Sequence, residues 1–76
     1  MSNVHTASYQ RFLKKLRRAR LEAGLSQVEV AKKLRKPQSY VSKCEAGERR
    51  VDFTELQRFA RVYGKGLKFF QTCPLI

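Results

Sequence analysis

The stretch SQVEVAKKLRKPQSYVSKCEAG, residues 26–47, decides the fold because it encodes two short helices separated by a brief turn. Ser26 is expected to cap the first helix, since its hydroxyl can accept a backbone N–H near Glu29. Glu29 stands three residues on, where a capping box requires a carboxylate. Apolar side chains then follow at the spacing of one helical face: Val30, Ala31 and Leu34. We therefore expect the first helix to end at about Leu34.

The second half of this stretch predicts another helix at a steep angle to the first. Pro37 disfavours α conformation in the residue before it and suits the first turn of a new helix. That helix is expected to span residues 38–46, and Gly47 can adopt the left-handed conformation that ends it. Its inner face carries Val41, Cys44 and Glu45. Because Ala31 lacks bulk, the two helices can approach closely. Such a pair is a helix-turn-helix.

A longer amphipathic helix is predicted upstream, from Ser8, its candidate cap, to Ala23, with Gly24 at its end. Its apolar stripe consists of Phe12, Leu16, Ala19 and Ala23, flanked by Tyr9 and Leu13. Its opposite face is basic, with Arg11, Lys14, Lys15, Arg17 and Arg18. A basic face of this kind is usually solvated, and a membrane surface is the alternative. Solvation is favoured, because Leu25 and the following helices provide a partner for the stripe.

Downstream, a fourth helix is expected to begin with a second capping box, formed by Asp52 and Glu55, and to end at Gly64. Its apolar face consists of Phe53, Leu56, Phe59, Ala60 and Tyr63. Residues 66–71 predict a short fifth helix with Leu67 and Phe70 turned inward. The expected fold is thus an all-α, compact five-helix bundle over residues 8–71, between a flexible leader (1–7) and an apolar tail (72–76).

The composition bounds the function. The 76 residues suffice for one small domain, and 17 Lys and Arg against six Asp and Glu give a net charge of +11. Residues 1–50 carry 13 basic and four acidic side chains (+9), whereas residues 51–76 carry four and two (+2). This excess indicates a polyanionic partner for the first three helices. No nucleophile–base pair, metal cluster or phosphate-cradling glycine loop occurs, so neither enzymatic activity nor a cofactor is expected.

Cellular location and cysteine usage both indicate a protein of the reducing cytoplasm. No apolar run approaches the roughly 20 residues that span a bilayer, and the N-terminus lacks the layout of a signal peptide. A cytoplasmic protein is therefore expected. Cys44 and Cys73 are interpreted as free thiols, in preference to a disulfide between them, with Cys44 acting as a small apolar group. His5 is the only histidine, and the ligands of a zinc site are missing.

Four segments together resemble the lambda Cro and phage-repressor type of helix-turn-helix DNA-binding domain, also called the XRE family. These segments are LRRARLEAGLSQ, VEVAKKL, QSYVSKCEAGERR and the YG that ends the fourth helix. The resemblance covers about residues 13–64, roughly two thirds of the chain. It implies a five-helix domain whose third helix enters the major groove of DNA.

The chemistry of residues 38–43 supports that placement independently. Four polar side chains lie on the face opposite Val41: Gln38, Ser39, Ser42 and Lys43. Glutamine can contact adenine N6 and N7, lysine can reach guanine O6 and N7, and serine serves several partners. We interpret these residues as contacts to DNA bases; the alternative is that they are ordinary exposed polar residues.

Five further residues are candidate contacts to DNA phosphates: Gln27, Lys36, Tyr40, Arg49 and Arg50. Gln27 opens a helix whose N-terminus favours an anion, and the resemblance implies that it fixes a phosphate and braces the recognition helix. Arg49 and Arg50 follow that helix, and Lys36 lies in the turn. The Tyr40 hydroxyl can contact a phosphate, its ring can contact a thymine methyl, or the side chain can simply pack against the core.

Two features concern the scaffold. The resemblance implies an ion pair between Arg20 of the first helix and Glu45 late in the recognition helix, partly buried and not in contact with DNA. The turn departs from the family pattern, because Arg35 and Lys36 replace the usual glycine and apolar residue. An arginine in left-handed conformation costs about 1 kcal/mol, so the conformation of this turn stays open.

The leading hypothesis is a sequence-specific regulator of transcription that binds double-stranded DNA, acting as a repressor and as a homodimer. The candidate dimer surface is the fourth helix and the tail, with Phe69, Leu75 and Ile76. The alternative is a protein-interaction module, such as an antitoxin or adaptor, whose apolar tail docks a protein partner and whose DNA binding is secondary.

Overall fold

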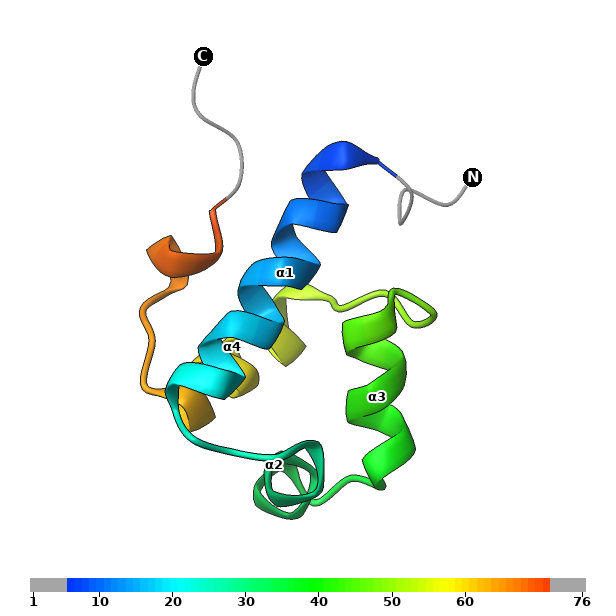
Figure 1. Cartoon of the computed structure of the whole chain (residues 1–76), viewed down its shortest axis with the longest axis vertical. Helices are drawn as coiled ribbons and strands as arrows, with labels where there is room; N and C mark the ends of the chain where they lie inside the picture. Colours follow the sequence, from blue (N-terminus) through cyan, green and yellow to red (C-terminus); the bar gives the residue numbers. More distant parts are fainter. Residues whose placement is uncertain (1–5, 72–76) are drawn as a thin grey trace.

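The computed structural model describes residues 6–71, which form four α-helices and one short 3-10 helix (Figure 1). Along the chain they are α1 (Ala7–Glu22), α2 (Gln27–Leu34), α3 (Gln38–Ala46), α4 (Phe53–Tyr63) and η1 (Leu67–Phe70). The all-α prediction is confirmed, but the predicted fifth α-helix is a 3-10 turn of four residues. No helix within residues 6–71 is long and apolar enough to cross a membrane.

The helix ends follow the caps that the sequence encodes, with one exception. Ser26 and Asp52 each form the predicted capping box. The side chain of the cap accepts the backbone N–H of the glutamate three residues on, and the carboxylate of that glutamate accepts the backbone N–H of the cap. At the start of α1, Thr6 rather than Ser8 is the cap, and it accepts the Tyr9 N–H at 3.1 Å. Residues 1–5 of the predicted leader and 72–76 of the predicted tail, with His5 and Cys73, lie outside the described residues.

The core lies between the four α-helices: α2 packs against α3 and α4, α1 packs against the same two helices, and η1 lies against α1 and α4 (Figure 1). Its buried members are Leu16, Ala19, Val30, Ala31, Leu34, Val41, Cys44, Phe59, Ala60, Tyr63 and Phe70. Ala31 is 3% exposed, as expected for a small residue between two close helices. Cys44 is a fully buried free thiol, and burial raises its pKa to about 11.

Three apolar residues that the helical pattern assigned to the core are exposed. Ala23 is exposed because α1 ends at Glu22, so the chain leaves the helical face before it. Phe53 and Leu67 are 63% and 38% exposed. They line a hollow on the surface instead of packing into the core.

The turn between α2 and α3 keeps a left-handed residue although no glycine is present. Arg35 has φ 58° and ψ 45°, and its C-terminal bonds to the helix include Lys36 N–H to Ala31 O at 2.9 Å. Arg58 of α4 donates from its guanidinium to Leu34 O at 3.0 Å. These bonds satisfy carbonyls that the end of α2 leaves open, and they offset the cost of the left-handed arginine.

Gly47 is required at the end of α3 for two reasons. Its φ of +81° lies in the left-handed region, and a Cβ placed there would come within 3.0 Å of Leu13 Cδ1. The missing side chain lets Leu13 of α1 pack closely against the end of α3.

Candidate nucleic-acid interface

Helix α3 turns one face into the core and the opposite face outward. Val41 and Cys44 are fully buried, which anchors the helix. Gln38, Ser39 and Lys43 are exposed, whereas Ser42 is only half-buried. The four residues predicted to contact bases therefore share one side of α3, with Ser42 set deeper than the rest.

The predicted ion pair between Arg20 and Glu45 is present and fastens α3 to α1. Arg20 Nε lies 2.6 Å from Glu45 Oε2, and Arg20 Nη2 lies 3.2 Å from Glu45 Oε1. The two side chains are only 9% and 6% exposed. Arg20 also donates from Nη1 to Leu25 O at 3.0 Å. The hydrogen bond to Glu45 raises the pKa of Arg20 above its usual value, so the guanidinium stays charged.

Gln27 connects this ion pair to the outer face of α3. Its Nε2 donates to Glu45 Oε1 at 3.0 Å, and its Oε1 accepts from Gln38 Nε2 at 3.1 Å. We call the four hydrogen-bonded side chains of Arg20, Glu45, Gln27 and Gln38 the amide relay. Gln27 thus braces the first residue of α3 through a direct contact.

Tyr40 packs against the core, which is one of the three interpretations that the sequence allows for this residue. Its ring stacks on Phe59 with centroids 6.1 Å apart and an interplanar angle of 3°. Burial and a hydrogen bond to Glu55 raise the pKa of Tyr40 to about 12, so its hydroxyl stays protonated.

Two of the basic phosphate candidates meet at the Tyr40 ring. Lys36 Nζ lies 5.2 Å and Arg49 Cζ 4.9 Å from its centroid. Arg49 is also paired with Glu55 at 2.8 Å, and this contact raises the pKa of the arginine. Arg50 is exposed and lies 5.4 Å from the centroid of Tyr9, in a separate contact at the start of α1. Positive charge is therefore held on both sides of the loop that follows α3.

A hollow of about 270 Å³ between α1, the start of α2 and α3 brings in Arg17, a residue of the basic face of α1 that was not among the predicted DNA contacts. It is lined by Arg17, Arg20, Gln27, Ser42, Glu45 and Ala46. Arg17 is exposed and adds positive charge beside the N-terminus of α2. The available signal was its position three residues before Arg20, which places both on one side of α1.

The arrangement has the parts of a DNA-reading helix: a buried inner face, an exposed polar outer face and cations at its borders. A comparison with curated proteins found no match. A family model described as helix-turn-helix, of the XRE and lambda-repressor type, matches residues 16–70, most of the chain. The chain therefore belongs to the lambda-repressor type of helix-turn-helix DNA-binding domains.

Proposed function

We propose that this chain is a sequence-specific regulator of transcription, which reads the major groove of double-stranded DNA with α3 and represses by occupying an operator. One observation carries the proposal. The outer face of α3 is polar and exposed at Gln38, Ser39 and Lys43, while its inner face is anchored by the fully buried Val41 and Cys44. A rigid helix that presents such side chains fits the major groove.

The base contacts are assigned by chemistry. Gln38 offers its acceptor and the donor that is not bonded to Gln27, a pair that suits adenine, and the Lys43 ammonium suits guanine O6 and N7. Ser39 contributes a hydroxyl contact to a base. Ser42 is half-buried beside α1, so its hydroxyl can contact only those DNA groups that enter the hollow there.

Phosphate contacts are assigned to the cations that border α3. Lys36 and Arg49 lie at the Tyr40 ring on one side of it, and Arg17 with Gln27 lie on the other, beside the positive end of the α2 dipole. Arg50 follows α3 and lies over the Tyr9 ring, at the start of α1. The Tyr40 ring holds Lys36 and Arg49 beside α3, so we assign Tyr40 the role of positioning these two cations for phosphate contacts.

Salt dependence tests the function directly. A protein that neutralises about five phosphates should lose affinity with a log–log slope of about −4 to −5 against salt concentration. Fluorescence anisotropy with a labelled duplex measures this slope. A chain without salt-dependent DNA binding would instead support the protein-interaction alternative, an antitoxin or adaptor.

Matched substitutions separate base contacts from phosphate contacts. Gln38→Ala and Lys43→Ala should relax the preference among sequences. Each should also cost roughly 1 to 3 kcal/mol of binding free energy on the preferred duplex. Arg50→Ala should weaken all duplexes alike, because a phosphate carries no sequence information. Equal and uniform losses in all three variants would show that the base contacts are wrongly assigned.

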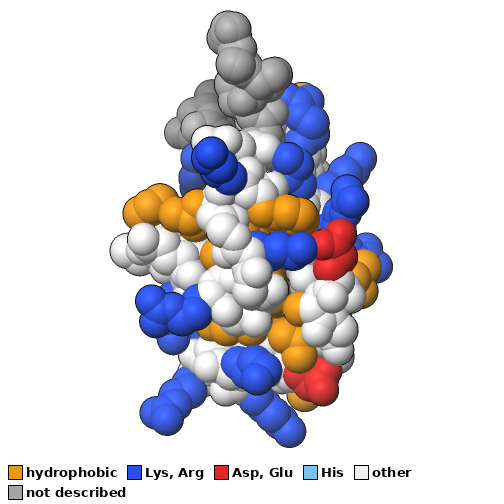
Figure 2. Space-filling model, turned by 90° about the vertical axis from the view of Figure 1, so that its left-hand side faces the viewer, with side chains coloured by type: hydrophobic (Ala, Val, Ile, Leu, Met, Phe, Trp, Pro, Cys, Tyr) orange, Lys and Arg blue, Asp and Glu red, His pale blue; other side chains and the backbone are white. Residues whose placement is uncertain are grey.

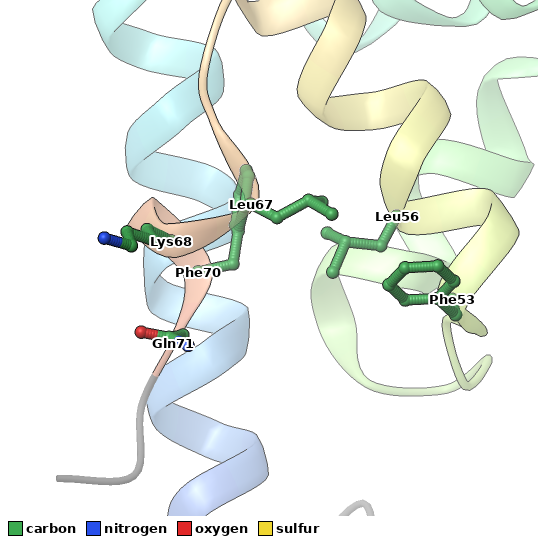
Figure 3. A pocket seen from close by; sticks show the side chains of 6 residues that line it. All are labelled: Phe53, Leu56, Leu67, Lys68, Phe70 and Gln71. Carbon is green, nitrogen blue, oxygen red and sulfur yellow. The ribbon is translucent and has the colours of Figure 1, made fainter. Parts of the chain in front are cut away.

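The homodimer that we propose uses the hollow formed by α4 and η1. Leu67 and Leu56 face each other across it, with Phe53 beside Leu56 and Phe70 on the η1 side (Figure 3). On the side of the molecule that carries η1, hydrophobic side chains reach the surface between Lys and Arg side chains (Figure 2). Of the predicted dimer residues, Phe69 is half-buried beneath Lys65, whose Nζ lies 4.6 Å from its ring centroid, and Leu75 and Ile76 lie outside the described residues.

A second copy of the chain is the occupant that charge favours. Residues 51–76 carry a balance of +2, against +9 for residues 1–50, so two copies repel each other least through α4 and η1. This arrangement also leaves both α3 helices free for two half-sites, and the second contact raises affinity by effective concentration.

Sedimentation equilibrium tests the dimer. Phe53→Glu should shift the native dimer to monomer, because it buries a carboxylate in an apolar contact. Leu21→Glu is the matched control, since Leu21 is 58% exposed on α1, away from the hollow. A native chain that stays monomeric, or a dimer that survives Phe53→Glu, would contradict this interface. We also propose a cytoplasmic location, as the sequence predicts.

A further inference from the structure

The amide relay runs from a buried ion pair to an exposed residue of the DNA-facing helix. Arg20 occupies both carboxylate oxygens of Glu45, whose side chain is 6% exposed. Oε1 of this carboxylate also accepts from Gln27, which in turn accepts from Gln38. Side chains of α1, α2 and α3 therefore form one continuous chain of hydrogen bonds.

The chemistry of the relay fixes the direction of every bond in it. A guanidinium only donates and an ionised carboxylate only accepts. Gln27 must therefore turn its Nε2 toward Glu45, which leaves its Oε1 facing Gln38. Gln38 must then turn its own Nε2 toward Gln27. One buried negative charge thus sets the orientation of two successive amides.

The orientation of the Gln38 amide decides what it can recognise. With one Nε2 hydrogen engaged, the exposed side chain still offers Oε1 and the second Nε2 hydrogen. Adenine presents a donor at N6 beside an acceptor at N7, which complements this pair, whereas guanine presents acceptors at both O6 and N7. An amide free to rotate by half a turn would lose this fixed polarity.

We propose that Glu45 is a specificity-determining positioning residue, which acts through Gln27 to make Gln38 prefer adenine without contacting DNA itself. This inference rests on the proposed function, since it requires that α3 reads bases. The ion pair then has two roles. It joins α1 to α3, and the negative charge of Glu45 also controls the ratio of affinities for different bases.

The test compares base preference in variants that interrupt the relay. The native chain first selects a duplex from a random pool, and the position read by Gln38 is found as the one where Gln38→Ala makes the four bases equivalent. Anisotropy at low salt then gives Kd for the duplexes that differ only there. We expect a native preference for adenine of roughly tenfold, falling below about twofold in Glu45→Gln and in Gln27→Met.

These two variants interrupt different links. In Glu45→Gln the new amide can either donate or accept, so it no longer orients Gln27. Gln27→Met removes the relay at its centre and leaves the Arg20–Glu45 pair intact, so it decides the test if Glu45→Gln does not fold. Glu55→Gln is the matched control, because it breaks an ion pair, with Arg49, that lies outside the relay.

The possible outcomes are distinguishable. Folded relay variants that keep the native preference for adenine would overturn the inference and leave the proposed function standing. A native preference for another base at that position, or an equal loss in Glu55→Gln, would also overturn it. A native chain that binds every duplex alike would overturn the proposed function, and the inference with it.

Discussion

Arg35 bears the conformational strain of the motif, since it is the only non-glycine residue with a positive φ among residues 6–71. We expect Arg35→Gly to stabilise the fold by roughly 0.5 to 1 kcal/mol. Relief of about 1 to 2 kcal/mol of left-handed strain exceeds the roughly 0.5 to 1 kcal/mol of additional chain entropy that glycine loses. Urea unfolding followed by circular dichroism measures the difference.

The control for this substitution is Arg35→Ala. It removes the same positive charge but keeps a Cβ, so the left-handed strain stays and no gain is expected. Equal stabilisation by glycine and alanine would show that charge repulsion, and not backbone strain, is what the arginine introduces.

Tyr63 presents a second local feature. Its hydroxyl is buried without a hydrogen-bond partner among the described residues, and the side chain is 5% exposed. Burial raises the pKa of this tyrosine well above its usual value. Tyr63→Phe should therefore leave the unfolding free energy unchanged or raise it by less than about 1 kcal/mol, because it removes only an unpaired polar group.

The same unfolding assay contains its own comparison. Burial and an interaction with Glu55 raise the pKa of the Tyr40 hydroxyl, so Tyr40→Phe removes that interaction and should be destabilising. A larger loss of stability in Tyr63→Phe than in Tyr40→Phe would mean that the buried hydroxyl has a partner in solution.

At the scale of the element, the capping box of α2 links helix stability to the placement of Gln27, its first residue. Ser26 Oγ accepts the Glu29 N–H at 3.1 Å, and Glu29 Oε1 accepts the Ser26 N–H at 2.8 Å. Ser26→Ala should cost about 1 kcal/mol of unfolding free energy, whereas Ser26→Asp should retain most of it. Thermal unfolding of the two variants side by side provides the measurement, and similar losses in both would argue against a capping role.

Elements with local causes could be predicted from the sequence. Both capping boxes, the left-handed glycines after α3 and α4, and the helix bounds to within a residue depend on side chains three or four positions apart. The cap of α1 was misplaced because Thr6 and Ser8 offer the same chemistry two residues apart, and the hydroxyl alone does not reveal which one the helix uses.

Features that depend on distant partners could not be predicted in the same way. The exposure of Phe53 and Leu67 depends on what lies opposite them, and helical periodicity gives only a direction. The Arg35 turn depends on Arg58, which reaches Leu34 O from α4. The Gln27–Glu45 link joins residues 18 positions apart, so only the assembled helices bring them together.

At the scale of the whole molecule, acid should destabilise the fold. Four carboxylates have clearly lowered pKa values. Hydrogen bonds from Lys65 and Arg18 lower the pKa of Glu22, and the capping boxes lower those of Glu29 and Asp52. Partial burial opposes the shift of Glu55, but hydrogen bonds to this carboxylate lower its pKa overall. Because these pKa values are lower in the folded chain, the unfolded chain binds protons first as the pH falls. The stabilisation is therefore complete above the unfolded values and is lost as pH falls through the folded ones.

Urea unfolding midpoints between about pH 6 and about pH 3 test this behaviour. The midpoint should hold until about pH 4.5 and then fall. Protonation of all six acids also raises the net charge from +11 to +17, which adds repulsion in the same direction. A midpoint that rises toward pH 3 would contradict the assignment, and high salt should restore only the part that is due to repulsion.

The cations held over Tyr40 have a practical consequence. The chain contains three tyrosines and no tryptophan, so its ultraviolet emission comes from tyrosine alone. Lys36 and Arg49 lie within 5.2 Å and 4.9 Å of the Tyr40 ring centroid. Phosphates that draw these two charges away would change the surroundings of a natural fluorophore. The domain thus carries its own optical reporter, through which docking can be followed without any attached dye.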